Sequence, residues 1–502
     1  MKEGATVYLI GYDIGTSSIK AALLDSDTGS AVASAVSPKK EMAIIAHHPG
    51  WAEQDPQCWW DNLKAATMEM LAKAKVAASD IKAVGISYQM HGLVCVNKQL
   101  EVIRPSIIWC DSRAVAIGEQ AAAKLGDKRC LESLLNLPGN FTAAKLKWVM
   151  DNEPQNYKKI YKIMLPGDYI AAKLTGKAAT TASGLSECMF WDFKNKAPAK
   201  FLIDHFGFSP ALLAELVPTF GVQGELTKQA AEELGLKAGT VVSYRAGDQP
   251  NNAFSLNVLK PGEIAATAGT SGVVYGIGDK LNYDLKSRVN TFAHVNSTSQ
   301  TPRYGVLLCV NGTGILNSWL KRTVAAGLDY DQMNRCAAET PIGSNGLVIL
   351  PYGNGAERTL ANRNIGAHIH NLNFNTHTVS HLLRAGQEGI VFALHYGIEI
   401  MRTMGIEIKT VRAGDANMFI SPLFGQAFAS VTGAVVELYN TDGAQGAARG
   451  AGVGAGVYKD FADAFVGLKA ARVIEPVQQL VLAYRQAYEQ WLAVLESRLA
   501  GK

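Results

Sequence analysis

The chain has 502 residues, which exceeds the roughly 250 to 300 residues that one hydrophobic core usually supports, so we expect two domains of similar size. Its 48 basic and 44 acidic side chains give a net charge of only +4 and form no block of like charge, which argues against nucleic acid as a partner. The first residues do not read as a signal peptide and no apolar run reaches the roughly 18 residues of a membrane span, so we expect a cytoplasmic protein with no membrane partner.

The first elements are three short strands between turn residues, at residues 6–12, 19–25 and 31–37. Their short connections predict an antiparallel meander. A helix is expected next, over residues 55–76, with Asp55 as its N-cap and Pro56 in its first turn. A strand at 81–87 and a loop at 88–92 follow.

A hairpin is then expected from two strand-like runs, at residues 93–97 and 102–109. The strand pattern starts again near residue 240, with segments at 239–248, 262–276 and 304–314. Two long helices are expected at 376–405 and 475–499, and the glycines within the first of them indicate close packing. Because the pattern repeats, we place the domains at 1–255 and 256–502.

Each half opens with a Gly-Thr-Ser turn between two apolar runs. The turns are formed by Gly15, Thr16 and Ser17, and by Gly269, Thr270 and Ser271. Such a turn exposes successive backbone N–H groups and hydroxyls, which together can hold an anion such as phosphate. One turn alone is more simply a hairpin, and neither copy fits a P-loop or a dinucleotide-binding fingerprint. Two copies, one in each half, favour two loops that grip one nucleotide triphosphate.

Two aspartates stand where phosphoryl transfer would need them. Asp13 lies just before the first turn and could hold Mg²⁺ through water, since magnesium keeps most of its hydration in proteins. Asp248 follows a predicted strand and is the best candidate for the general base that takes a proton from the attacking hydroxyl. The ordinary alternative for Asp248, an N-cap or an Asx turn, stays open.

At this point the sequence resembles the FGGY family of carbohydrate kinases over roughly residues 5–460. The motifs that carry the resemblance, in order, are YDIGTSSIKAALLD, HPGWAEQDPQCWWDN, PSIIWCDSR, LPGNFTAAKLKWV, LPGDYIAAKLTG, ATAGTSGVV and NGTGILNSW. The resemblance implies an α/β fold of the actin-like, hexokinase type, with two ribonuclease H-like domains around an active-site cleft. It also implies ATP and Mg²⁺ as cofactors.

Within the family, the QMHG segment at residues 89–92 is most similar to the xylulose kinases. The similarity implies that Asp248 deprotonates the 5-hydroxyl of D-xylulose, which attacks the γ-phosphate of MgATP to give D-xylulose 5-phosphate and ADP. The sugar contacts that it implies are Gln89, Met90, His91, Asp111 and Gln249. Besides the two turns, the nucleotide contacts that it implies are Gly314, Gly414 and Asn417.

The segment Ala246-Gly247-Asp248-Gln249 and the loop that contains Asn417 depart from the usual family pattern and resemble the glycerol kinase branch. The exact acceptor therefore stays open among D-xylulose, L-ribulose, L-xylulose, glycerol and gluconate. A homodimer is a further expectation, although no residue reports on the oligomeric state.

Two rival functions share parts of this pattern. An actin-like nucleotide switch would have the same fold but would need no sugar pocket. A metalloenzyme would use the two histidine pairs His368 with His370 and His377 with His381, although no carboxylate or cysteine lies well placed beside them. The seven cysteines are scattered and indicate reduced thiols rather than a zinc site or disulfides.

Overall fold

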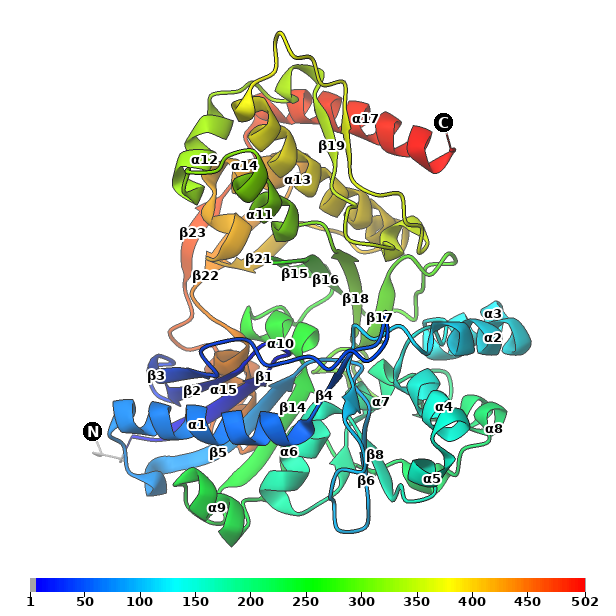
Figure 1. Cartoon of the computed structure of the whole chain (residues 1–502). Coiled ribbons are helices and arrows are strands. Elements are labelled where there is room, and N and C mark those ends of the chain that lie inside the picture. Colours follow the sequence, from blue (N-terminus) through cyan, green and yellow to red (C-terminus); the bar gives the residue numbers. More distant parts are fainter. Residues whose placement is uncertain (1–5, 502) are drawn as a thin grey trace. The chain divides into compact units, whose positions relative to one another are not determined.

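The computed structural model describes residues 6–501, which form two compact units (Figure 1). Among the described residues, the first unit comprises residues 6–257, Phe292–Tyr304 and Thr441–Leu468. The second unit comprises Val258–Thr291, Gly305–Asn440 and residues 469–501. The expected division into 1–255 and 256–502 therefore differs from the structure, because two segments of the second half of the chain belong to the first unit.

The first unit is built on a six-stranded sheet with the order β13-β14-β5-β1-β2-β3. Its strands are β1 (Tyr8–Ile14), β2 (Ile19–Asp25), β3 (Ala31–Ser37), β5 (Ile81–Tyr88), β13 (Phe220–Glu225) and β14 (Val241–Gly247). Strands β1, β2 and β3 form the expected antiparallel meander. Strand β5 runs parallel to both β1 and β14. The C-terminal ends of these three neighbouring strands therefore lie side by side at the same end of the sheet.

Two helices cover opposite faces of this sheet: α1 (Pro56–Ala74) and α15 (Gly443–Gly454). Tyr12 of β1 points to α1, where its hydroxyl lies 2.8 Å from the Thr67 hydroxyl. The neighbouring Gly11 points to α15, and a side chain there would come within 1.8 Å of the Ala444 carbonyl oxygen. Helix α15 therefore lies directly on the backbone of the sheet. This contact explains why a late segment of the chain belongs to the first unit.

Helix α1 begins as predicted, since the Asp55 side chain accepts a hydrogen bond from the Gln57 N–H. It ends at Ala74, two residues before the predicted end, because Lys75 adopts a left-handed conformation with φ 55°. The remaining helices of the first unit are α2 (Val115–Leu125), α3 (Asp127–Leu134), α4 (Thr142–Asn152), α5 (Pro154–Tyr157), α6 (Pro166–Thr175), α7 (Ala182–Glu187), α8 (Lys200–Phe206), α9 (Lys228–Leu234), α10 (Asp248–Ser255) and α16 (Phe461–Ala464).

The predicted hairpin of residues 93–97 and 102–109 is confirmed in part. Two isolated antiparallel bridges join the runs, Leu93 with Ile107 and Val96 with Val102, and Leu93 and Ile107 exchange backbone hydrogen bonds. The longer pairings are with other segments: strand β6 (Val94–Val96) pairs with β8 (Lys162–Met164), and β7 (Ser106–Ile107) pairs with β4 (Glu53–Gln54). These additional partners lie far away in the sequence, so local alternation cannot reveal them. The other short strands of this unit are β9 (Ala179–Thr180), β10 (Trp191–Asp192), β11 (Ala197–Pro198) and β12 (Glu215–Leu216).

The second unit is built on a seven-stranded sheet with the order β17-β18-β16-β15-β21-β22-β23. Its strands are β15 (Glu263–Ala268), β16 (Gly272–Gly278), β17 (Asn290–Ala293), β18 (Tyr304–Val310), β21 (Thr410–Gly414), β22 (Val435–Tyr439) and β23 (Ala470–Ile474). A separate ribbon pairs β19 (Val348–Leu350) with β20 (His368–His370). The helices are α11 (Gly314–Thr323), α12 (Tyr330–Ala338), α13 (Val379–Thr403), α14 (Pro422–Thr432) and α17 (Gln478–Leu499).

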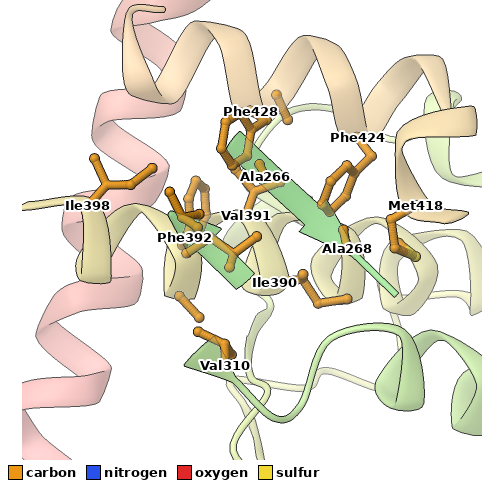
Figure 2. Packing of buried hydrophobic residues seen from close by; sticks show 14 of the residues in the cluster. Ala266, Ala268, Val310, Ile390, Val391, Phe392, Ile398, Met418, Phe424 and Phe428 are labelled. Carbon is orange, nitrogen blue, oxygen red and sulfur yellow. The ribbon is translucent and has the colours of Figure 1, made fainter. Parts of the chain in front are cut away.

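The core of the second unit lies between its sheet and the long helix α13. Figure 2 shows Ile390 and Phe392 of α13 and Phe424 and Phe428 of α14 gathered around Ala266 of β15. The glycines within α13 permit the close packing predicted for them: a side chain at Gly389 would come within 2.3 Å of the Ile349 carbonyl oxygen. Across residues 6–501, no helix combines the length and the apolar character that crossing a membrane requires.

Candidate active site

The first Gly-Thr-Ser turn joins β1 to β2 and is closed by a hydrogen bond of 3.1 Å from the Gly15 N–H to the Ser18 carbonyl oxygen. The Thr16 hydroxyl donates to Gln89 Oε1 at 3.2 Å and accepts from the Trp109 indole N–H at 2.9 Å. Ser17 is exposed at the tip of the turn. The structure therefore ties the predicted phosphate turn to Gln89, the first residue of the QMHG segment.

Asp13 lies near the end of β1, and its carboxylate is close to Gly443, the first residue of α15. The Ser87 hydroxyl donates to Asp13 Oδ1 at 2.9 Å, and a side chain at Gly443 would come within 2.6 Å of Asp13 Oδ2. Only glycine therefore fits as the first residue of α15. Burial raises the pKa of Asp13, while Lys20 and the bond from Ser87 act in the opposite direction.

Asp248 is the first residue of α10 and directly follows β14. It keeps part of its surface exposed, and Gln249 donates to its carboxylate through both backbone and side chain. Burial, followed by the negative charge of Asp13, raises the pKa of Asp248 to about 7. A carboxylate with a pKa close to neutrality is suited to general-base catalysis.

Met90 and His91 lie on the loop after β5, close to the strand that ends before Asp248. Met90 is buried, and a side chain at Gly247 would come within 2.6 Å of Met90 Cγ. The His91 ring packs edge-on against Phe141, with 4.8 Å between the ring centroids. The structure thus brings the predicted sugar residues Met90 and His91 to the segment that carries Asp248.

Two buried charged residues that the sequence did not single out hold this loop. The Glu187 carboxylate accepts a hydrogen bond from the Tyr88 hydroxyl at 2.8 Å and one from the His91 backbone N–H at 3.0 Å. The Lys145 ammonium donates to the carbonyl oxygens of His91, at 2.9 Å, and of Ile108, at 3.0 Å. The only signal in the sequence is that each is a charged residue among apolar neighbours, in SGLSECMFW and in FTAAKLKWV.

Asp111, expected to contact the sugar, is completely buried. Its carboxylate accepts from the Ala52 N–H at 2.6 Å and from the Arg113 guanidinium, the closest atom of which lies at 2.7 Å. Arg113 in turn stacks on Trp51, with 3.8 Å to the ring centroid. Both oxygens of Asp111 are engaged, so its side chain supports the fold rather than presenting an open ligand for a sugar.

The second unit contains a pocket of about 530 Å³. Four of the predicted nucleotide residues line it: Gly269, Thr270, Gly314 and Asn417. Residues that the sequence did not single out complete its wall, among them Tyr330, Asp331, Asn334, Met418 and Ile420. Within residues 6–501, the lining does not include the other two predictions for this unit, Ser271 and Gly414.

One end of this pocket is formed where the second Gly-Thr-Ser turn meets helix α11. The Gly314 N–H donates to the Gly269 carbonyl oxygen at 2.9 Å, and the Ile315 N–H donates to that of Thr270 at 3.2 Å. A side chain at Gly314 would come within 2.3 Å of the Gly269 oxygen, so glycine is required at this position. Backbone groups at this end and aromatic, apolar and amide side chains elsewhere suit a ligand that is partly polar and partly flat.

Three of the four histidines of the metalloenzyme alternative, His368, His377 and His381, make hydrogen bonds to neighbouring segments. His377 Nδ1 accepts from the Asn373 N–H at 3.0 Å, and His381 Nδ1 accepts from the Thr378 N–H at 3.2 Å. These bonds hold the loop that leads into α13. In the part of the chain that the structure describes, no three His, Cys, Asp or Glu side chains gather as metal ligands. The structure therefore gives no support to a zinc-type centre.

Comparison with known proteins links this geometry to one family. Models of the N-terminal and C-terminal domains of the FGGY family of carbohydrate kinases match residues 8–255 and 264–457. A xylulose kinase of Bacillus subtilis (strain 168) is 30% identical over 494 residues, which cover 96% of this chain and 95% of that protein. The crystal structure of a "xyloylose kinase" from Brucella ovis is 27% identical with a TM-score of 0.88, covering 99% of this chain and 100% of that chain. A gluconate kinase from Lactobacillus acidophilus shares the fold, with 22% identity and a TM-score of 0.90 over 99% of both chains.

Proposed function

Because the chain belongs to the FGGY family of carbohydrate kinases, and is therefore an ATP-dependent sugar kinase, we propose that its acceptor is D-xylulose. The reaction transfers the γ-phosphate of ATP to the terminal 5-hydroxyl and gives D-xylulose 5-phosphate and ADP. One observation carries the choice of sugar site: Met90 and His91 lie against the segment that ends in Asp248. The names of relatives such as the Bacillus subtilis enzyme support a ketopentose as the acceptor.

Asp248 is the general base of the proposed reaction. It takes the proton from the 5-hydroxyl, whose oxygen forms the new bond to phosphorus while the bond to the β,γ-bridging oxygen breaks and ADP leaves. A pKa of about 7 leaves a substantial fraction of Asp248 ionised at neutral pH. Gln249 supports this role because it donates hydrogen bonds to the same carboxylate.

Mg²⁺ would be held at Asp13 through water, and when bound it neutralises charge on the phosphates. The fit rests on the chemistry of the site: Asp13 offers a hard oxygen ligand, and Asp248 adds a second negative charge that interacts with it. Both carboxylates belong to the first unit, and magnesium commonly uses only one or two such ligands.

ATP is proposed to bind the 530 Å³ pocket of the second unit, with phosphates at Gly269 and Thr270 and the adenosine near Asn417. Ser271 and Gly414 stay as proposed neighbours of the nucleotide. In the first unit, Gly15, Thr16 and Ser17 are proposed to contact the terminal phosphates. Because transfer requires an in-line arrangement, both ligands must be held in one closed state of the enzyme that excludes water.

A different acceptor is the alternative function within the same family. Gln249 beside the base resembles the glycerol kinase branch, and L-ribulose, L-xylulose, glycerol and gluconate are the candidates. Membership in a kinase family favours phosphoryl transfer over a nucleotide switch.

A coupled assay of ADP release with each of these compounds and with D-xylulose tests the proposal. We expect the highest kcat/KM with D-xylulose. A higher value with glycerol or gluconate would refute the ketopentose acceptor, and equal ADP release with and without any acceptor would refute transfer to a sugar.

A further inference from the structure

We propose that Glu187 and Lys145 are positioning residues that clamp His91 by both ends of its backbone and thereby aim its imidazole at the sugar. The inference rests on the proposed function, since it takes His91 as a sugar contact. It adds two residues, Glu187 on helix α7 and Lys145 on helix α4, that were not among the predicted site residues.

His91 adopts a backbone conformation that needs external support. Its φ of 60° lies in the left-handed region, which residues other than glycine rarely occupy. Such a conformation persists only where surrounding contacts hold it, and it occurs often at ligand sites. In His91 both backbone groups are held: the N–H donates to Glu187, and the carbonyl oxygen accepts from Lys145.

The ring of His91 is oriented by the same partners. Its Nδ1 lies 3.1 Å from the Glu187 carbonyl oxygen, which can only accept a hydrogen bond. The neutral ring therefore carries its proton on Nδ1, and Nε2 becomes the acceptor. A ring nitrogen that accepts is suited to a sugar hydroxyl, which can donate. Edge-on packing against Phe141 and a contact with Phe292 fix the ring plane.

Two opposing influences act on the charge of Glu187. Burial, together with the charges of Asp248 and Asp168, raises the pKa of Glu187 well above its ordinary value, while the hydrogen bonds from Tyr88 and His91 act in the opposite direction. The Glu187 carboxyl group accepts from the Tyr88 hydroxyl with Oε1 and from the His91 N–H with Oε2. A glutamine side chain can keep both contacts, with its oxygen accepting from the His91 N–H and its NH2 group donating to the Tyr88 oxygen, whereas a leucine can make neither.

Lys145 closes the other end of the clamp. Its side chain is completely buried, and its two carbonyl acceptors, on His91 and Ile108, come from separate segments of the first unit. Burial lowers the pKa of Lys145 to about 8, while the charge of Asp111 acts in the opposite direction. Burying an ammonium group costs free energy, and here the group donates to two backbone oxygens, those of His91 and Ile108. This arrangement indicates that Lys145 serves to fix the position of the loop that carries His91.

A double-mutant cycle tests the clamp. The variants are E187L, H91A and the double variant E187L/H91A, and the measurement is the KM for D-xylulose or for the best acceptor of the panel. We expect E187L to raise this KM about tenfold, because the His91 N–H loses its partner. If Glu187 acts through His91, the KM of the double variant for the sugar will be no higher than that of H91A alone. Multiplicative effects of the two substitutions would overturn the inference.

Conservative and matched variants separate positioning from general stability. E187Q is expected to have a KM for the sugar close to that of the unmodified enzyme. A KM for the sugar in E187Q as high as that in E187L would also overturn the inference. The KM for ATP should stay within about twofold of the value of the unmodified enzyme in all of these variants, since the proposed ATP pocket belongs to the second unit. The matched control is E132L, at a glutamate whose partners are the exposed Lys128 and Lys194, and its KM values should not change.

The cycle also separates this inference from the proposed function. If H91A leaves the KM for the sugar unchanged, His91 is not a sugar contact, and the proposed site and the clamp both fail. If H91A raises the KM but E187L adds its full effect to it, only the clamp fails. If thermal melting shows that E187L does not fold, K145M takes its place in the same cycle with the same expectation.

Discussion

The negative charge of Asp13 acts on Asp248 and helps to raise its pKa to about 7. Asp13 lies near the end of β1 and Asp248 begins α10, so the fold brings together two carboxylates that are far apart in the sequence. Since like charges disfavour each other's ionisation, Asp248 holds its proton up to a higher pH than an isolated aspartate. Such a group is a stronger base and is still substantially ionised at neutral pH.

Replacing the proposed base tests its role. Asp248→Asn keeps the size of the side chain and removes the proton acceptor, so we expect kcat to fall by about 10² to 10⁴. Binding of MgATP, measured by calorimetry, should persist. Asp27→Asn, at an exposed turn, is the matched control and should keep normal turnover. Near-normal turnover of the Asp248 variant would place the base elsewhere.

The pH profile of kcat/KM for the sugar should follow the ionisation of Asp248. We expect a loss of about tenfold per pH unit below pH 7, because only the ionised carboxylate can accept the proton. Asp13→Asn removes a negative neighbour, which favours ionisation of Asp248, so the acid limb should move to lower pH. A limb that stays in place would show that the charge of Asp13 does not set the pKa.

The same pKa predicts a cost in stability. The folded pKa of about 7 lies above the ordinary value of 3.8, so between these pH values the folded protein retains a proton that the unfolded chain has lost. Asp248 therefore destabilises the fold increasingly as pH rises through this window. Asp248→Asn should raise the free energy of unfolding at pH 8 by about 1 kcal/mol or more, and hardly at all at pH 4. Thermal melting at the two pH values measures the difference.

Much of this site was predictable where it depends on local sequence. The turn at Gly15 lies between two strands whose alternation is visible, and Asp55 and Pro56 mark the start of α1. The surroundings of His91 were not predictable, because Lys145 and Glu187 lie 54 and 96 residues further along the chain. Hydrogen bonds over such separations depend on the packed fold and leave no periodic signal.

The role expected of Asp111 shows a second limit. A motif with an acid and a base two residues apart, Asp111 and Arg113, does not reveal whether they face a ligand or each other. In the structure they face each other inside the fold. The cost of burying an unpaired charge decides this outcome, and burial cannot be read from spacing alone.

Helix α11 offers a test of the nucleotide pocket. Gly314→Ala would place a carbon 2.3 Å from the Gly269 carbonyl oxygen and so push the turn and the helix apart. We expect the KM for ATP to rise about tenfold and the KM for the sugar to stay unchanged. Gly278→Ala in β16, where a side chain would meet nothing within 4 Å, is the control. Equal KM values for ATP in both variants would contradict the assignment of this pocket.

Removal of the metal tests the role of Asp13. Turnover should stop in excess EDTA and return with added Mg²⁺. Asp13→Asn should raise the Mg²⁺ concentration needed for half-maximal rate, because one negative charge near the metal is lost. Titration of the rate with Mg²⁺ at saturating ATP gives this value. An unchanged half-maximal concentration would exclude Asp13 as a ligand, even through water.

The position of α15 on the first unit has a consequence for synthesis of the protein on the ribosome. The sheet face that presents Gly11 is made early, but the helix that covers it ends at Gly454. Until that helix has left the exit tunnel, the nascent chain exposes this face. The first unit therefore cannot finish folding before most of the second has been translated, which lengthens the time during which the growing chain exposes an incompletely covered sheet.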